Sequence, residues 1–349
     1  MIIKTLTLKN FRNHKSISYE FQPGLNILTG PNTVGKTNVV EAIHYLSLGR
    51  SFRTTEGSEL IQKGNLQAFI EAVCYEGELK RNIRIVISPN SRNIFINGKQ
   101  AKTIQLYNCM NVLLFEPKNV LMFRGSPKTR RDFLDNGLSK KSISYLETLL
   151  KYDKVLKERN NLLKSENINP VLLEINTKML VELSEKIVKD RIQYVKDIND
   201  LLIKITRALT GVNGKLEINY KPFIAPSENF QKDALEAFKR AEERDLRQKA
   251  TSIGVHREDF SISLNGRDIG QYGSQGENRI VALALKLSPY FLVKDKDKRP
   301  VVVLDDVMSE LDQAHRLRLV EFVKKLDQVF ITATRLEVKG AAHYQIKKE

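Results

Sequence analysis

The sequence is poor in cysteine and in long apolar runs. Its 349 residues include two cysteines, Cys74 and Cys109, and each lies in an apolar stretch, as buried core cysteines do. Their number and spacing provide no Cys-x-x-Cys metal site and no disulfide framework. The longest uninterrupted apolar run covers residues 280–285, whereas a membrane-spanning helix needs about 20 residues. These absences exclude a membrane span and predict a protein of the reducing cytoplasm.

Acidic residues are also scarce relative to basic ones. The chain has 57 Lys and Arg against 41 Asp and Glu, a net charge of +16. The excess is uneven, because residues 118–164 alone carry 12 Lys and Arg against 5 Asp and Glu. A balance of this size indicates a polyanionic partner such as nucleic acid, although solubility alone could also account for it.

The hydrophobic pattern predicts a mixed α/β fold. Alternating or apolar segments indicate strands at residues 2–8, 16–21, 25–28, 68–75, 82–87, 93–96 and 301–304. The last of these is apolar throughout, which is typical of a strand buried on both faces of a parallel sheet. Between residues 127 and 249 the apolar positions recur every three or four residues, which predicts helices. We therefore expect an α/β head formed by residues 1–126 and 250–349, with an antiparallel β annex and a helical lobe, residues 127–249, inserted between its two segments.

A glycine-rich segment after the third expected strand predicts a phosphate-binding loop. Residues 30–37 fit the pattern G-x-x-x-x-G-K-[ST] between a strand and an expected helix at 38–48. Main-chain N–H groups of such a loop surround phosphates, the lysine reaches the β and γ phosphates, and the last hydroxyl can coordinate Mg²⁺. The expected nucleotide ligands are Gly30, Pro31, Asn32, Thr33, Val34, Gly35, Lys36 and Thr37. The chain is thus predicted to bind a nucleoside triphosphate with Mg²⁺.

Two adjacent carboxylates follow the buried strand at 301–304. In the neighbourhood of a phosphate-binding loop, Asp305 is expected to hold Mg²⁺ together with Thr37, and Asp306 to orient or activate the attacking water. Lys36 and Asp306 are therefore the predicted catalytic residues.

A third motif opens the expected helix that begins near residue 278. Small residues at a helix start can bind an anion through main-chain N–H groups and a serine hydroxyl. Here these residues are Ser274 and Gly276, and the alternative is an ordinary helix cap formed by Ser274. Because one loop already holds the phosphates, we expect this motif to bind the γ-phosphate carried by another subunit.

Together these motifs resemble the heads of ABC-type ATPases, a group that includes the structural-maintenance-of-chromosomes proteins. In such heads two copies enclose two ATP molecules, and Ser309-Glu310-Leu311-Asp312 matches the loop that crosses their interface. The insertion is too short for a long coiled-coil arm, since Ser274 lies 244 positions after Gly30. That length, with the motifs at residues 10–13, 49–54, 125–131 and 254–257, resembles the bacterial RecF family.

The resemblance implies an ATP-dependent DNA-binding protein of recombinational repair. Members of that family form homodimers when ATP is bound, and they act with RecR and RecO to load RecA. They bind double-stranded and single-stranded DNA, particularly duplex next to single-stranded gaps. Their ATP hydrolysis is slow and resets the dimer. The resemblance therefore also implies roles in DNA replication, DNA damage and the SOS response.

The sequence departs from the ATPase pattern at several positions. Glu277 stands where many relatives have Gln, and Val255 stands where Pro is common. The switch histidine of transporter ATPases is missing, so Thr334 is a candidate γ-phosphate sensor, and no Q-loop can be assigned. These departures indicate weak or differently organised hydrolysis. The alternative functions are the ATP-binding subunit of a membrane transporter and a P-loop kinase or GTPase, although the latter lacks the Asn-Lys-x-Asp motif.

Overall fold

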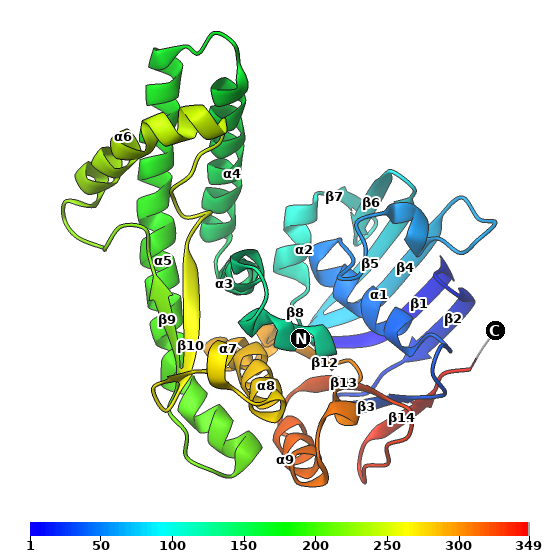
Figure 1. Cartoon of the computed structure of the whole chain (residues 1–349). Coiled ribbons are helices and arrows are strands. Elements are labelled where there is room, and N and C mark those ends of the chain that lie inside the picture. Colours follow the sequence, from blue (N-terminus) through cyan, green and yellow to red (C-terminus); the bar gives the residue numbers. More distant parts are fainter. Residues whose placement is uncertain (348–349) are drawn as a thin grey trace. The chain divides into compact units, whose positions relative to one another are not determined.

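The computed structural model describes residues 1–347, which form two compact units (Figure 1). The first, called the head unit below, comprises Met1–Val120, Leu201–Gly214 and Ser274–Glu349. The second, called the lobe unit, comprises Leu121–Asp200 and Lys215–Gly273. The domain boundaries predicted at residues 127 and 249 stay a prediction.

Runs of strands and runs of helices follow one another along the chain. The strands are β1 (Ile2–Phe11), β2 (His14–Glu20), β3 (Gly24–Thr29), β4 (Ala68–Glu76), β5 (Leu79–Ser88), β6 (Ser91–Ile96), β7 (Lys99–Ala101), β8 (Val112–Phe115), β9 (Leu216–Lys221), β10 (Asp259–Leu264), β11 (Arg267–Asp268), β12 (Val301–Leu304), β13 (Gln328–Ala333) and β14 (Ala342–Gln345). The α-helices are α1 (Lys36–Leu48), α2 (Thr103–Cys109), α3 (Pro127–Lys141), α4 (Ile143–Lys164), α5 (Pro170–Thr210), α6 (Phe230–Gln248), α7 (Ile269–Tyr272), α8 (Gln275–Leu292) and α9 (Gln313–Val323). Short 3₁₀ helices are η1 (Gly57–Leu60), η2 (Pro117–Phe123), η3 (Lys296–Lys298) and η4 (Val307–Glu310).

A five-stranded parallel sheet forms the centre of the head unit. Its order is β14-β3-β13-β12-β8. All four residues of β12 are buried, which confirms the strand predicted to be covered on both faces. Because side chains alternate between the two faces of a strand, Val301 and Val303 join the core shared with α1, whereas α8 packs beside β8.

A second sheet of six antiparallel strands covers the other side of α1. Its order is β2-β1-β4-β5-β6-β7, and it is the predicted antiparallel annex. Alternate residues such as Leu6, Ile70 and Ile85 are fully buried and pack with Val39 and Ile43 of α1 in one core. The period-two pattern of these strands thus leaves a second face turned away from the core.

The lobe unit is mainly helical but also contains a small sheet. Helix α5 begins at Pro170 and has 41 residues, of which those from Leu201 onward belong to the head unit. The expected helical pattern is interrupted by β9, which pairs with β10 in the three-stranded sheet β11-β10-β9. Two buried ion pairs help to hold the unit together, Arg159 with Asp245 and Arg191 with Glu258.

None of the helices within residues 1–347 is both long enough and apolar enough to cross a lipid bilayer.

Candidate nucleotide-binding site

The predicted phosphate-binding loop connects β3 to α1, as the motif requires. Gly35 has φ +107° and is the N-cap residue of α1, and no side chain caps this helix. A Cβ atom at Gly35 would lie 2.6 Å from Nε2 of His14 and 2.7 Å from Oδ1 of Asn13. Glycine is therefore needed here for both conformation and space. The first turn of α1 accordingly presents main-chain N–H groups that an anion can accept.

The Lys36 side chain contacts the main chain of this loop. Its Nζ donates to the carbonyl oxygens of Gly30 at 2.6 Å and Pro31 at 2.8 Å. Partial burial lowers the pKa of Lys36, and the carboxylates of Asp306 and Asp305 oppose that shift. The ammonium group is thus held by the loop, and the two carboxylates are near enough to influence its pKa.

Asp305 follows β12 and faces the end of the loop. Its Oδ1 accepts a hydrogen bond from Thr37 at 3.3 Å and another from Thr332 at 2.7 Å. Only 5% of Asp305 is exposed, and burial raises its pKa while the two hydroxyl groups oppose the rise. A hydroxyl and a carboxylate of this kind are ligands that Mg²⁺ accepts together with phosphate oxygens and water.

Thr332 is the site residue that the sequence analysis missed. It lies on β13, between β3 and β12 in the sheet, and its Oγ1 also accepts from the main-chain N of Asp306 at 2.8 Å. One hydroxyl therefore fixes both carboxylate residues. Thr334, the candidate sensor, is exposed and follows the last residue of β13.

Asp306 leaves the strand with its backbone in the left-handed region. Its φ is +49° and it precedes η4, whose Ser309 donates to the Asp306 carbonyl oxygen at 2.9 Å. The side chain of Asp306 is exposed next to the buried Asp305. This arrangement connects the predicted base directly to the loop at residues 309–312.

The predicted second anion site starts α8. Ser274 is the N-cap residue, its Oγ accepts from Glu277 N at 3.2 Å, and Glu277 Oε2 accepts from Ser274 N at 2.8 Å. Glu277, which stands where many relatives have Gln, thus completes a capping box. Ser274 and Gly276 are exposed, and a Cβ at Gly276 would have nothing within 4 Å. The helix start is therefore open to solvent.

The chain is similar to known proteins over nearly all of its length. The RecF/RecN/SMC N-terminal domain family matches residues 2–347. DNA replication and repair protein RecF of Lachnoclostridium phytofermentans is 35% identical over 97% of this chain and 94% of its own length. The chain belongs to the RecF family. The RecF protein of Halalkalibacterium halodurans is 34% identical over 100% of this chain and 96% of its own length.

Solved structures agree with this assignment. A structure of the recombination mediator protein RecF-ATP in the RecFOR pathway has a TM-score of 0.91 and 32% identity, over 99% of this chain and 97% of that one. An SMC head domain from Pyrococcus furiosus has a TM-score of 0.56 and 17% identity, over 95% and 89% of the two chains, and so shares the fold alone. The predicted ABC-type ATPase fold is thus confirmed.

Residues 10–13, one of the motifs of the RecF resemblance, contact the phosphate-binding loop and the helix that follows it. Asn13 Nδ2 donates to the carbonyl oxygen of Val34 at 3.1 Å, and Asn13 Oδ1 accepts from Asn38 at 2.6 Å. Arg12 binds the fully buried Glu41 of α1 through two bonds of 2.7 and 2.9 Å. The motif therefore fixes both the loop and the helix that follows it.

The family motifs at residues 125–131 and 254–257 lie in the lobe unit. Arg130 binds Asp259 through two bonds of 2.6 and 2.8 Å, and Arg131 donates to the Glu258 carbonyl oxygen at 2.8 Å. His256 shares a 2.8 Å hydrogen bond with Tyr152. Burial lowers the pKa of His256 to about 4, so this histidine is neutral at pH 7 and is part of the packing.

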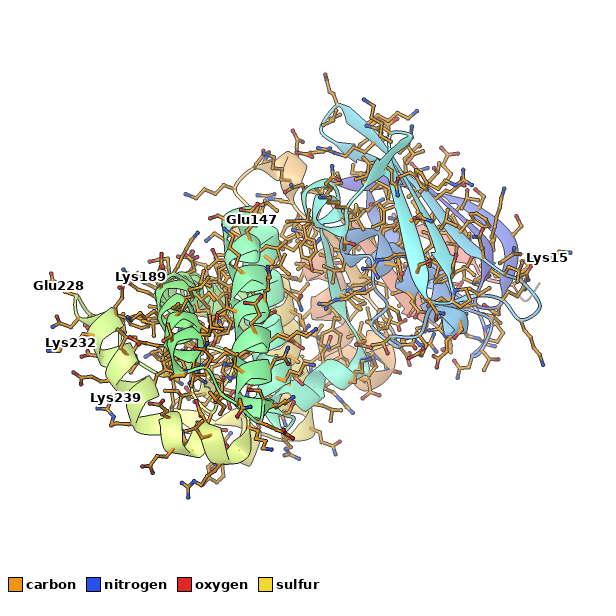
Figure 2. The ribbon with its side chains drawn as sticks, turned by 90° about the horizontal axis from the view of Figure 1, so that it is seen from above. Lys15, Glu147, Lys189, Glu228, Lys232 and Lys239 are labelled. Atoms are coloured by element: carbon orange, nitrogen blue, oxygen red, sulfur yellow. The ribbon has the colours of Figure 1, made fainter. Side chains whose placement is uncertain are left out.

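The same contacts reduce the free charge of the basic stretch at residues 118–164. At least seven of its twelve cations form an ion pair or a hydrogen bond to a carbonyl oxygen, namely Lys118, Arg124, Arg130, Arg131, Lys141, Lys154 and Arg159. The head unit has 31 Lys and Arg against 19 Asp and Glu, whereas the lobe unit has 26 against 22. Side chains of both signs extend from the lobe unit, among them Glu147, Lys189 and Lys239 in Figure 2. Most of the positive excess of the chain therefore belongs to the head unit.

Proposed function

We propose that this chain is an ATP-dependent DNA-binding switch of recombinational repair, with a head of residues 1–126 and 250–349 and a lobe of residues 127–249. The observation that carries the proposal is the contact between Thr37 and Asp305, which are 268 positions apart in the sequence. That contact places the end of a phosphate-binding loop beside a buried carboxylate, as Mg²⁺-dependent binding of a triphosphate requires. The similar RecF-ATP structure supports the same ligand.

The residues present fit ATP and Mg²⁺. The uncapped start of α1 would hold phosphate oxygens, and Lys36 would exchange its carbonyl partners for the β and γ phosphates. Thr37 and Asp305 would coordinate Mg²⁺, which when bound neutralises charge on the phosphates. Within residues 1–347 no cluster of three or more His, Cys, Asp or Glu forms a metal site, which suits a cation held largely by phosphate and water. Asp306 would accept a hydrogen bond from the attacking water and orient it.

Hydrolysis would be completed by a second copy of the chain. The Ser274 hydroxyl accepts its bond from Glu277 N, so its own O–H remains able to donate to a γ-phosphate on the partner. Gly276 would let the helix start approach that phosphate closely. A site divided in this way makes ATP binding and dimerisation one event, and release of phosphate opens the dimer.

DNA and the recombination mediators are the proposed partners. The names of the relatives place them in DNA replication and repair and in the RecFOR pathway, and the positive head unit suits phosphate contacts. We therefore propose binding to duplex and gapped DNA, action with RecR and RecO in loading RecA, and slow ATP turnover. Membership of the RecF family disfavours the transporter and kinase alternatives.

Light scattering with ATP and Mg²⁺ tests this function. We expect the wild type to become a dimer, whereas Lys36→Ala, which weakens triphosphate binding, and Ser274→Arg, which blocks the open helix start, remain monomers. A wild type that stays monomeric at saturating ATP, or a Ser274→Arg variant that dimerises equally well, contradicts the shared site.

The salt dependence of duplex binding tests the DNA partner. Phosphate contacts by several cations should reduce affinity by about 10³-fold or more between 50 and 200 mM salt. An affinity that does not change over this range would exclude phosphate contacts as the main source of binding.

A further inference from the structure

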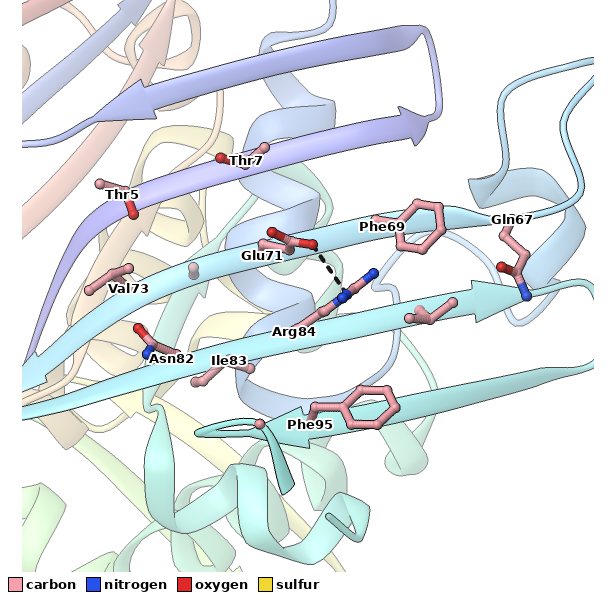
Figure 3. A pocket seen from close by; sticks show the side chains of 13 residues that line it. Thr5, Thr7, Gln67, Phe69, Glu71, Val73, Asn82, Ile83, Arg84 and Phe95 are labelled. Atoms are coloured by element: carbon pink, nitrogen blue, oxygen red, sulfur yellow. Dashed lines mark ion pairs between the residues drawn. The ribbon is translucent and has the colours of Figure 1, made fainter. Parts of the chain in front are cut away.

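The six-stranded sheet carries an open groove on the face turned away from the core. Its volume is about 690 Å³. Residues of β1, β4, β5 and β6 line it (Figure 3). Asn82 and Arg84 are exposed there, and Phe69 and Phe95 are half-buried. The opposite face of the same strands is part of the head-unit core, so the groove is separate from the packing that stabilises the fold.

Two aromatic rings and a guanidinium group follow one another across this groove. Phe69 lies on β4, Arg84 on β5 and Phe95 on β6 (Figure 3), and Phe95 is the register partner of Arg84. The Arg84 guanidinium carbon lies 5.5 Å from the centroid of the Phe69 ring. Since adjacent strands are about 4.8 Å apart, the two rings are separated by about 10 Å across the strands.

The residues that line the groove carry one cation, Arg84, and one carboxylate, Glu71, and further cations lie beside it. From residue 79 to residue 115 the chain has six cations and no Asp or Glu. Lys80 and Arg84 are on the groove side of β5, and Lys9 is the register partner of Phe69. Arg84 pairs with Glu71 at 3.2 Å, with both side chains largely exposed, and such a surface pair is weak enough to yield to a stronger anion.

We propose that this groove binds single-stranded DNA. Phe69 and Phe95 stack on unpaired bases, Arg84 exchanges Glu71 for a phosphate, and Lys9 and Lys80 contact the adjoining backbone. Sheet faces that combine exposed rings with cations bind single strands in this way, because every base offers a π face. In duplex DNA the faces of the bases are covered by stacking, so the aromatic rings of the groove cannot stack on them.

This inference rests on the proposed function and makes it more specific, because it gives the single-stranded side of a gap a site of its own. The duplex side then needs other cations of the chain. A protein with both surfaces recognises the junction itself and not merely one of its arms.

Fluorescence anisotropy with labelled oligothymidylate and with a labelled duplex tests the assignment. Phe69→Leu and Phe95→Leu keep an apolar side chain but lose the ring, so each should weaken oligothymidylate binding about tenfold. Duplex affinity and ATP-dependent dimerisation should remain at wild-type levels, which also shows that the variants fold. The matched control is Leu66→Ala, which changes an exposed apolar residue outside the groove and should alter neither affinity.

The absence of tryptophan from the chain provides a direct reporter. In Phe95→Trp the one indole lies in the groove, and stacking of a base should quench its emission as oligothymidylate is added. Unchanged emission at saturating oligonucleotide, or wild-type affinity in both leucine variants, overturns the proposal. Emission that changes with protein concentration alone would identify a self-association face and would also overturn it. If duplex binding and dimerisation persist in either case, the proposed function stands without this site.

Discussion

Replacing Thr332 by Val removes one hydroxyl and keeps the shape of the side chain. In the structure that hydroxyl donates to Asp305 Oδ1 at 2.7 Å and accepts from Asp306 N at 2.8 Å. A hydrogen bond to an ionised carboxylate contributes about 2 kcal/mol, and an N–H left without its partner adds to the loss. Thr332→Val should therefore destabilise the head unit by about 2–4 kcal/mol.

Thr332→Val should weaken Mg²⁺ binding by more than its loss of unfolding free energy alone would cause. A residue that orients a metal ligand typically changes metal affinity by about 10-fold or more, so the Mg²⁺ concentration for half-maximal dimerisation should rise by about that factor. The Thr332 hydroxyl also opposes the raised pKa of Asp305. Its loss raises that pKa further, so protons should compete with Mg²⁺ at a higher pH than in the wild type.

The assay is light scattering at saturating ATP with increasing Mg²⁺, repeated at several pH values, with urea unfolding in parallel. Thr332→Ser retains the hydroxyl and should restore the wild-type Mg²⁺ requirement. A Thr332→Val protein with the wild-type Mg²⁺ midpoint and pH dependence would refute the positioning role, even if its stability is lower.

Three further predictions concern stability and the phosphate-binding loop. Gly35→Ala should lower the unfolding free energy by about 1–3 kcal/mol, since φ +107° and the nearby side chains leave no room for a methyl group. The same change should abolish ATP binding measured by calorimetry, and a wild-type ATP affinity would contradict this. Burial lowers the pKa of His256 from 6.5 to about 4, so about 3 kcal/mol of unfolding free energy should be lost as the pH falls from 6.5 to 4. In urea unfolding curves, His256→Gln should lack this pH-dependent loss. An identical pH dependence in the variant and the wild type would contradict the buried, neutral histidine. Arg159→Met leaves Asp245 buried without its partner and should lower the unfolding free energy by about 3–5 kcal/mol. Urea unfolding measures this change, with Lys154→Met in an exposed ion pair as the control. Equal effects of the two substitutions would refute a stabilising role of the buried pair.

Local sequence patterns were sufficient for much of the fold. The apolar strand at residues 301–304 and the glycines around Lys36 each depend on near neighbours in the chain, and both were predicted correctly as elements. The alternation of β4 and β5 likewise gave strands within a few residues of their observed bounds. These features follow from side-chain periodicity and turn chemistry, which are properties of a short window.

Features that depend on distant partners were not predictable in the same way. Thr332 joins the site because β13 lies between β3 and β12, and strand order cannot be obtained from a short window. Strand β9 was hidden in a stretch with helical spacing because its pairing partner β10 lies about 40 residues further on. The basic segment at residues 118–164 suggested a DNA surface, but the acids that neutralise part of it, such as Asp259 and Asp245, come from elsewhere in the sequence.

Mixing two inactive variants tests the shared nucleotide most directly. Lys36→Ala and Ser274→Arg should each stay monomeric with ATP and Mg²⁺, yet a mixed dimer contains one site with an intact lysine from one chain and an intact serine from the other. The proposed function therefore predicts that the mixture dimerises, whereas a chain carrying both changes fails to dimerise with the wild type. If the mixture stays monomeric while the wild type dimerises under the same conditions, the two motifs do not meet across a dimer interface.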